Sequence, residues 1–152
     1  MQFTFSDDEE AYRRELNRFA RKVLAPHYQA DDKTAKLRPE LVADMAGMGL
    51  TGLRIPERFG GQEASAVIAG LAAEEVAYGD FNATYLIIVT ALISDILTRN
   101  ATEAQQAEWL PAIASGEVVP AFCITEPQHG TDAAALEMRA EPTADGWLLT
   151  GE

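Results

Sequence analysis

The sequence has 152 residues, 47% of them apolar and 24% charged, which is the size and composition of one ordinary globular domain. Its 24 acidic residues outnumber 12 basic ones and give a formal net charge of -12. Such a surface repels phosphate backbones and anionic lipid, which argues against binding to nucleic acid or to a membrane surface.

Three features bear on the cellular compartment. The single cysteine, Cys123, cannot form a disulfide within the chain, which weakly favours a reducing compartment. The start, MQFTFSDDEE, lacks the basic and apolar segments of a secretory signal peptide. The most apolar stretch, ATYLIIVTALISDIL, is short for a membrane span and contains an aspartate. We therefore expect a cytoplasmic protein.

Apolar residues recur at helical spacing through most of the chain. Ser6 caps a first helix, the acidic start of which suits the helix dipole, and Pro26 ends or kinks it. A polar link, QADDKTAK, leads to a short helix over 39–48, which Gly49 ends. After the loop LTGLRIPERFGGQ, a third helix is predicted over 64–78.

A fourth helix, predicted over 82–99, is apolar nearly all round, so we expect it at the centre of the bundle. Thr102 caps a fifth helix that reaches about Ser115. Pro111 lies inside this fifth helix and can divide it.

After Gly116 the pattern changes to that of strands. Apolar residues between 118 and 124 predict one strand, and LEMRAEPT predicts another. Ala144-Asp145-Gly146 is a turn signal, and WLLTGE is the returning strand. We predict an α+β fold, with an all-α helical bundle over 1–116 and the first strands of a β-domain over 117–152. So few strands cannot close a sheet, so the sequence looks like the front part of something longer.

The stretch FCITEPQHGTD combines an apolar run with an abrupt loop. Pro127 lacks an N–H and holds Glu126 in extended geometry. Gly130 permits a turn or a close ligand approach, and Thr131 and Asp132 offer a hydroxyl and free amides. Such a loop can cradle an anion such as phosphate, and the alternative is an ordinary turn.

The run F-C-I-T-E-P-x-x-G-T-D closely resembles the signature of acyl-CoA dehydrogenases, an aromatic residue followed by x-x-T-E-P-x-x-G-[ST]-D. Earlier in the chain, GLTGLRIPERFGGQ is similar to that family's G-x-x-x-x-x-x-P-E-x-x-G-G, and EEVAYGD also fits. Later, DGWLLTGE is similar to its hairpin. Because these matches fall in the expected order over nearly the whole chain, the sequence is identified as a member of that family.

The resemblance implies a flavoprotein with an N-terminal helical domain, a middle β-barrel-like domain and a C-terminal four-helix bundle, with FAD between the last two. It implies α,β-desaturation of an acyl-CoA thioester, in which a glutamate removes the α-proton and hydride leaves to the flavin. An electron-transfer flavoprotein would take the electrons, and the protein would form dimers or tetramers. The base glutamate belongs to the C-terminal bundle, so no catalytic residue is assigned in this chain.

The resemblance also assigns cofactor contacts. By position in the motif, Phe122, Ile124 and Thr125 would face the flavin ring, with Thr125 hydrogen-bonding its pyrimidine end. Gly130 and Thr131 would approach the pyrophosphate of FAD, and Thr131 would also lie along the acyl-CoA. The alternative for both threonines is an ordinary strand or cap hydroxyl.

A substrate contact is implied for the fourth helix. Tyr85, Ile88 and Leu92 recur at i, i+3 and i+7, so they share one face of that helix. In the family the equivalent helix lines the acyl cavity, and a bulky Tyr85 would shorten it. The alternative is that the three side chains are bundle core.

Other polar residues receive different interpretations. Glu126 is expected to orient its loop rather than to act as the base. Glu74 and Glu75 are expected on a solvated face or as a pair that interacts with the helix dipole. His129 stands where the family usually has a small residue, and it either adds a donor near the phosphates or points into solvent. No metal site is predicted, because the histidines are isolated in sequence.

Three other functions stay open on these residues. Acyl-CoA oxidases and flavin monooxygenases share the architecture of the family. A function of another class is a non-catalytic helical module that associates with a partner chain.

Overall fold

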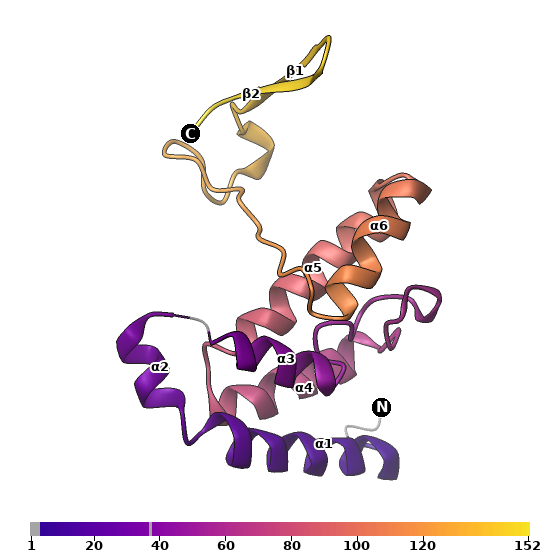
Figure 1. Cartoon of the computed structure of the whole chain (residues 1–152), viewed down its shortest axis with the longest axis vertical. Coiled ribbons are helices and arrows are strands. Elements are labelled where there is room, and N and C mark those ends of the chain that lie inside the picture. The colour runs from indigo at the N-terminus through magenta and orange to yellow at the C-terminus, as the bar shows by residue number, and fades with distance from the viewer. Residues whose placement is uncertain (1–3, 37) are drawn as a thin grey trace. The chain divides into compact units, whose positions relative to one another are not determined.

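The computed structural model describes residues 4–36 and 38–152 and divides into two compact units, one that ends at Ala121 and one that comprises Phe122–Glu152. The helices α1 to α6 belong to the first unit and a β-hairpin to the second (Figure 1). The predicted α+β order, helices first and strands after them, is confirmed. Within the described residues, no helix is both long and apolar enough to cross a membrane.

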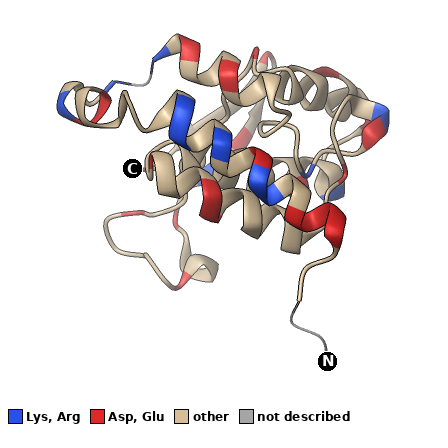
Figure 2. Cartoon of the chain, turned by 90° about the horizontal axis from the view of Figure 1, so that it is seen from below, with Lys and Arg blue, Asp and Glu red and all other residues tan. Residues whose placement is uncertain are grey.

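The first helix, α1 (Asp7–Phe19), begins at Ser6 as predicted. The Ser6 hydroxyl accepts a hydrogen bond from the backbone N–H of Glu9, and the Glu9 carboxylate accepts one of 2.7 Å from the backbone N–H of Ser6. This capping box satisfies N–H groups that a helix start otherwise leaves unpaired, and its hydrogen bonds lower the pKa of Glu9. Acidic residues fill the first turn and basic residues follow along the helix (Figure 2).

A π-turn, η1 (Ala20–Leu24), extends the first helix. Its wider hydrogen bond runs from the Ala25 N–H to the Ala20 carbonyl, at 2.9 Å. Pro26 follows directly, so the helical segment ends where the proline predicted.

The interpretation of QADDKTAK as a link is wrong, because Tyr28–Thr34 forms a short helix, α2. The sequence of this helix, YQADDKT, has no apolar stripe that could predict it, and the helix buries no residue. Polar contacts hold it instead, including an ion pair between Asp31 and Arg38.

The next helix, α3 (Pro39–Gly47), has Pro39 in its first turn, as predicted. The loop that follows contains a short 3-10 turn, η2 (Glu57–Phe59), and closes on itself through backbone hydrogen bonds. One of these runs from the Ala64 N–H to the Leu53 carbonyl, at 2.9 Å. The predicted loop is therefore well defined, and Leu53 within it is buried in the core.

Three longer helices complete the first unit: α4 (Ala66–Gly79), α5 (Thr84–Asn100) and α6 (Glu103–Ala114). Helix α4 packs against α1 and η1 and also against α5, and α5 packs against α6. Pro111 does not divide α6, which continues to Ala114. Leu110 and Ile113, on either side of the proline, are both buried in one cluster, and this packing holds the last turn in place.

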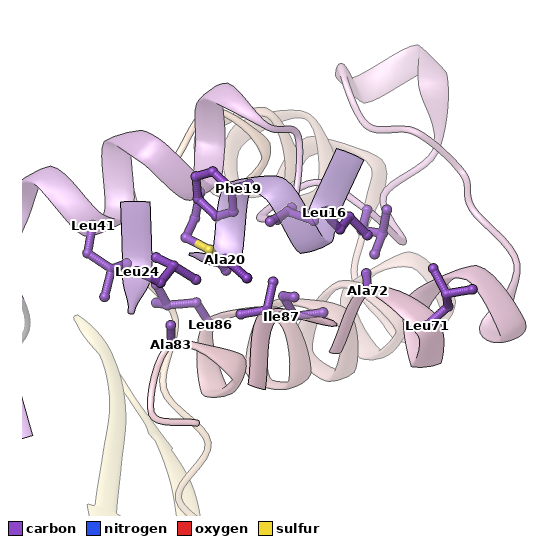
Figure 3. Packing of buried hydrophobic residues seen from close by; sticks show 14 residues of the cluster. Leu16, Phe19, Ala20, Leu24, Leu41, Leu71, Ala72, Ala83, Leu86 and Ile87 are labelled. Carbon is purple, nitrogen blue, oxygen red and sulfur yellow. The ribbon is translucent and has the colours of Figure 1, made fainter. Parts of the chain in front are cut away.

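The main hydrophobic core lies among the first helical segment, α3, α4 and α5. Figure 3 shows its side chains meeting between these helices, among them Leu16, Ala20, Leu24, Ala72, Leu86 and Ile87. The prediction that the fourth helix is central to the bundle is wrong for this chain. Only one face of α5 is buried, and large apolar side chains are exposed on another face.

The second unit contains the predicted hairpin, β1 (Arg139–Thr143) and β2 (Gly146–Thr150), joined by a two-residue turn at Ala144 and Asp145. The strands are antiparallel, with Ala140 opposite Leu149. The strand predicted between 118 and 124 does not form. A strand needs a neighbour for its backbone groups, and in the part of the chain that the structure describes β1 and β2 pair only with each other.

Candidate functional site

The predicted cofactor residues lie together at the start of the second unit. Phe122 and Ile124 are 42% and 37% exposed, and the large apolar side chains of the hairpin, such as Trp147 and Leu149, are exposed as well. Thr125 and Thr131 are exposed as well. The five predicted cofactor residues are therefore exposed within their own unit and accessible to a ligand.

Glu126 differs from its neighbours, because it is buried to 8% exposure. Its carboxylate accepts hydrogen bonds from the backbone N–H groups of Glu137, at 2.7 Å, and Met138, at 2.8 Å. These two hydrogen bonds lower the pKa of Glu126 below the ordinary glutamate value of 4.5. The carboxylate is thus fully engaged by backbone amides, which agrees with an orienting role and not with that of a general base.

The loop after Glu126 leaves room at Gly130. The φ angle of Gly130 is not in the left-handed region, and a Cβ there would meet nothing within 4 Å. Neither backbone strain nor crowding in this chain therefore requires a glycine. The space beside Gly130 is open, and close approach of a pyrophosphate to this residue stays a prediction.

His129 only partly fits the alternative that it points into solvent, and a role as a donor near the phosphates stays a prediction. Its side chain is 25% exposed and lies against the loop, with Nε2 3.4 Å from a carboxylate oxygen of Glu137. The Glu137 side chain, at 71% exposure, faces the solvent instead. Nothing in the residue pattern indicated this pairing, since the two residues are eight positions apart.

A hollow of about 900 Å³ lies beside this loop, lined by Glu126, Gln128 and the ends of the hairpin strands. The five predicted cofactor residues do not line it. The hollow is therefore not the predicted cofactor site, and we assign no ligand to it.

The predicted substrate residues lie on α5, in the first unit. Tyr85, Ile88 and Leu92 are 56%, 50% and 40% exposed and share one face of the helix. The alternative that they are bundle core is therefore wrong for this chain. Phe81 and Ile96 continue the same exposed stripe beyond them, and the rings of Phe81 and Tyr85 meet edge to face with centroids 6.0 Å apart.

One glutamate is buried, contrary to the prediction from its sequence. Glu75 was expected on a solvated face, but it is 6% exposed and accepts hydrogen bonds of 2.7 Å from Arg13 and Asn17 of α1. A signal existed, because Glu75 stands one helical turn after Leu71 and one before Gly79, in the buried stripe of α4. Its contacts join α1 to α4.

The helical unit defines the class of the protein. Residues 6–117 match the family description of the acyl-CoA dehydrogenase N-terminal domain. The T-E-P loop and hairpin follow in the order that the sequence predicted. The chain belongs to the acyl-CoA dehydrogenase family.

Similar proteins agree with this assignment. The (2S)-methylsuccinyl-CoA dehydrogenase of Cereibacter sphaeroides is 36% identical over 143 residues, which cover 93% of this chain and 26% of the relative. A probable acyl-CoA dehydrogenase of Bacillus subtilis is 31% identical, and the match covers 100% of this chain and 40% of the relative.

Solved structures show the same fold. A glutaryl-CoA dehydrogenase of Mycobacterium smegmatis, in complex with FADH2, matches with a TM-score of 0.89 and 28% identity, over 97% of this chain and 38% of that one. Butyryl-CoA dehydrogenase from Megasphaera elsdenii matches with a TM-score of 0.86 and 29% identity, over 99% of this chain and 41% of that one. The chain thus spans less than half the length of these relatives.

Proposed function

We propose that this chain is the flavin-contacting and helical part of an FAD-dependent acyl-CoA dehydrogenase, which desaturates an acyl-CoA thioester between Cα and Cβ. The observation that carries the proposal is the T-E-P-x-x-G-T-D segment, in which Thr125, Gly130 and Thr131 are exposed, on a chain of this family. Phe122, Ile124 and Thr125 would hold the flavin ring, and Gly130 and Thr131 the pyrophosphate. When bound, FAD supplies the acceptor for the substrate hydride.

The residues of this chain bind and orient in this proposal, and they do not transfer the α-proton. Thr125 would donate its hydroxyl to the pyrimidine end of the flavin, and Thr131 would donate to a phosphate oxygen. The apolar face of Tyr85, Ile88 and Leu92 would contact the acyl chain. The electrons would pass to an electron-transfer flavoprotein, and the assembly would be a dimer or a tetramer in the cytoplasm.

The complete gene product is expected to purify with FAD, which its absorption spectrum and intact mass measure. Because a hydroxyl on a phosphate makes a charge-assisted hydrogen bond, Thr131→Val should weaken FAD retention about tenfold or more. Thr131→Ser is the control, since it keeps the hydroxyl, and its FAD retention should match that of the parent. A folded gene product that takes up no added FAD contradicts the proposal and favours the non-catalytic module.

A second prediction concerns the face of α5. Tyr85→Ala should shift the preference of the complete enzyme toward longer acyl chains, because the bulky ring would shorten the acyl cavity. The 152-residue chain should lose less than about 1.5 kcal/mol of unfolding free energy, mainly the edge contact with Phe81.

The control for Tyr85 is the neighbouring Leu86, which is 6% exposed and points into the core. Leu86→Ala should cost roughly 2–5 kcal/mol, as buried leucine truncations do. A chain-length profile and a melting curve on both variants separate the two roles. An unchanged profile for Tyr85→Ala removes this residue from the substrate site.

A further inference from the structure

Glu126 contacts its loop through both its backbone and its side chain. Its backbone N–H donates to the His129 carbonyl at 3.0 Å, and its carbonyl accepts from the His129 N–H at 3.2 Å. These two hydrogen bonds close a tight turn around Pro127. The side chain then reaches past this turn to Glu137 and Met138.

The side-chain contacts close a ring in the chain. They join residue 126 to residues 137 and 138, directly before β1 begins at Arg139. Gly130 and Thr131 lie inside this ring, while Thr125 is the residue immediately before it. The carboxylate therefore connects the stretch that carries Thr125 to the loop that carries Thr131.

A carboxylate suits this position for a specific reason. It offers two oxygen atoms, and each accepts one N–H from a pair of consecutive backbone amides. A glutamine would offer a single acceptor oxygen, and an alanine none. The amides of Glu137 and Met138 lie outside any strand pairing, so within the ring the carboxylate is what satisfies them.

We infer that Glu126 is a positioning residue for cofactor binding: its carboxylate fixes the Gly130–Thr131 loop relative to Thr125, and so sets the spacing between the flavin-ring and pyrophosphate contacts. This inference rests on the proposed function. Glu126 itself touches neither ligand, and acts through the loop that it closes.

The first experiment tests ring closure without any flavin, on the 152-residue chain. Amide hydrogen exchange at Glu137 and Met138 should be at least about tenfold faster in Glu126→Ala than in the parent, because both N–H groups lose their acceptor. Glu141→Ala is the matched control, since it removes an exposed carboxylate from the same unit.

A second measurement on the same chain follows the Met138 amide resonance as a function of pH. It reports the ionisation of Glu126, which a general loosening of the loop would not reproduce. In the parent, the Met138 amide resonance should move as pH falls through the lowered pKa of Glu126, below 4.5. In Glu126→Gln this transition should be absent. If amide exchange in Glu126→Ala and the pH transition in Glu126→Gln are both the same as in the parent, the Glu126 carboxylate does not close the ring.

The second experiment measures FAD retention and the absorption spectrum of bound flavin in the complete gene product. We expect Glu126→Ala to retain FAD at least about tenfold more weakly than Glu141→Ala, and Glu126→Gln to lie between them. The flavin band should also shift, because Thr125 would no longer be held in place. The melting of the helical unit should stay unchanged.

The outcomes separate this inference from the function on which it rests. A Glu126→Ala protein that retains FAD like the parent overturns the inference and leaves the proposed function intact. A parent protein that binds no FAD overturns both, whatever the ring does. Faster amide exchange together with weaker FAD retention supports both.

Discussion

Gly79→Ala is expected to destabilise the helical unit by about 3 kcal/mol, because a side chain there has no space. A Cβ on Gly79 would lie 2.5 Å from the carbonyl oxygen of Ala20 and 2.9 Å from its Cα. Both neighbours are backbone atoms, so no flexible side chain can give way. Ala20 is fully buried, and its carbonyl already accepts the hydrogen bond of the π-turn.

The same helix supplies a matched control. Gly70 also lies in α4, but a Cβ there would meet nothing within 4 Å. Gly70→Ala should therefore stabilise the chain by about 0.5–1 kcal/mol, because alanine has the better helix propensity. Denaturant unfolding of the two variants should give opposite signs. Equal effects would mean that α4 does not approach η1 closely at its C-terminal end.

The sequence predicted a helix correctly where apolar residues recur along one side of it. The capping residues Ser6 and Thr102 also gave two starts correctly, because a capping box is a local signal. The polar helix α2 was not predicted, because local contacts and an ion pair hold it and its sequence has no apolar stripe. Pro111 misled in the other direction, because burial of its neighbours outweighs the lost hydrogen bond.

In the candidate site, too, local features could be predicted from the sequence and long-range contacts could not. The position of the T-E-P segment followed from its residues, but the strand expected before it did not form, because pairing depends on partners distant in sequence. The buried state of Glu126 depends on the return of the chain at Glu137, eleven residues later. Spacing along the sequence does not encode such a return.

The face of α5 shows a further limit. Its sequence is apolar on all sides, and this pattern predicted a central helix. The pattern gives the apolarity of each face but not its neighbour, so the exposed Tyr85 and the buried Leu86 look alike in sequence. Exposure in the structure is what separates a candidate contact surface from core.

The buried carboxylate of Glu75 leads to the second large effect. Arg13→Ala is expected to destabilise the folded chain at neutral pH, because Glu75 keeps its charge and loses its cation. The loss should be smaller than the roughly 3–5 kcal/mol that breaking a fully buried pair costs, since the Arg13 side chain is 43% exposed and water can reach the site. The exposed Arg14 is the control, and Arg14→Ala should change stability by no more than about 0.5 kcal/mol.

The pH dependence identifies the cause. Burial raises the pKa of Glu75, but the hydrogen bonds from Arg13 and Asn17 and the charges of Arg13 and Arg21 outweigh it, so the pKa lies below 4.5. A lowered pKa stabilises the folded state above the ordinary value, and this stability is lost as pH falls through the folded pKa. In Arg13→Ala the hydrogen bond and the charge of Arg13 no longer lower the pKa of Glu75, while burial and the Asn17 hydrogen bond remain. The variant should therefore lose less stability than the parent as the pH falls through this range.

The difference between Arg13→Ala and Arg14→Ala should therefore be large at pH 7 and shrink as the pH falls below 4.5, because a protonated Glu75 no longer needs a cation. Urea unfolding at a series of pH values measures this difference directly. The aliphatic stem of Arg13 also packs, and its loss would be independent of pH. A deficit that stays constant between neutral and acid pH would therefore assign the contribution of Arg13 to packing, and would leave the contact between α1 and α4 without an electrostatic component.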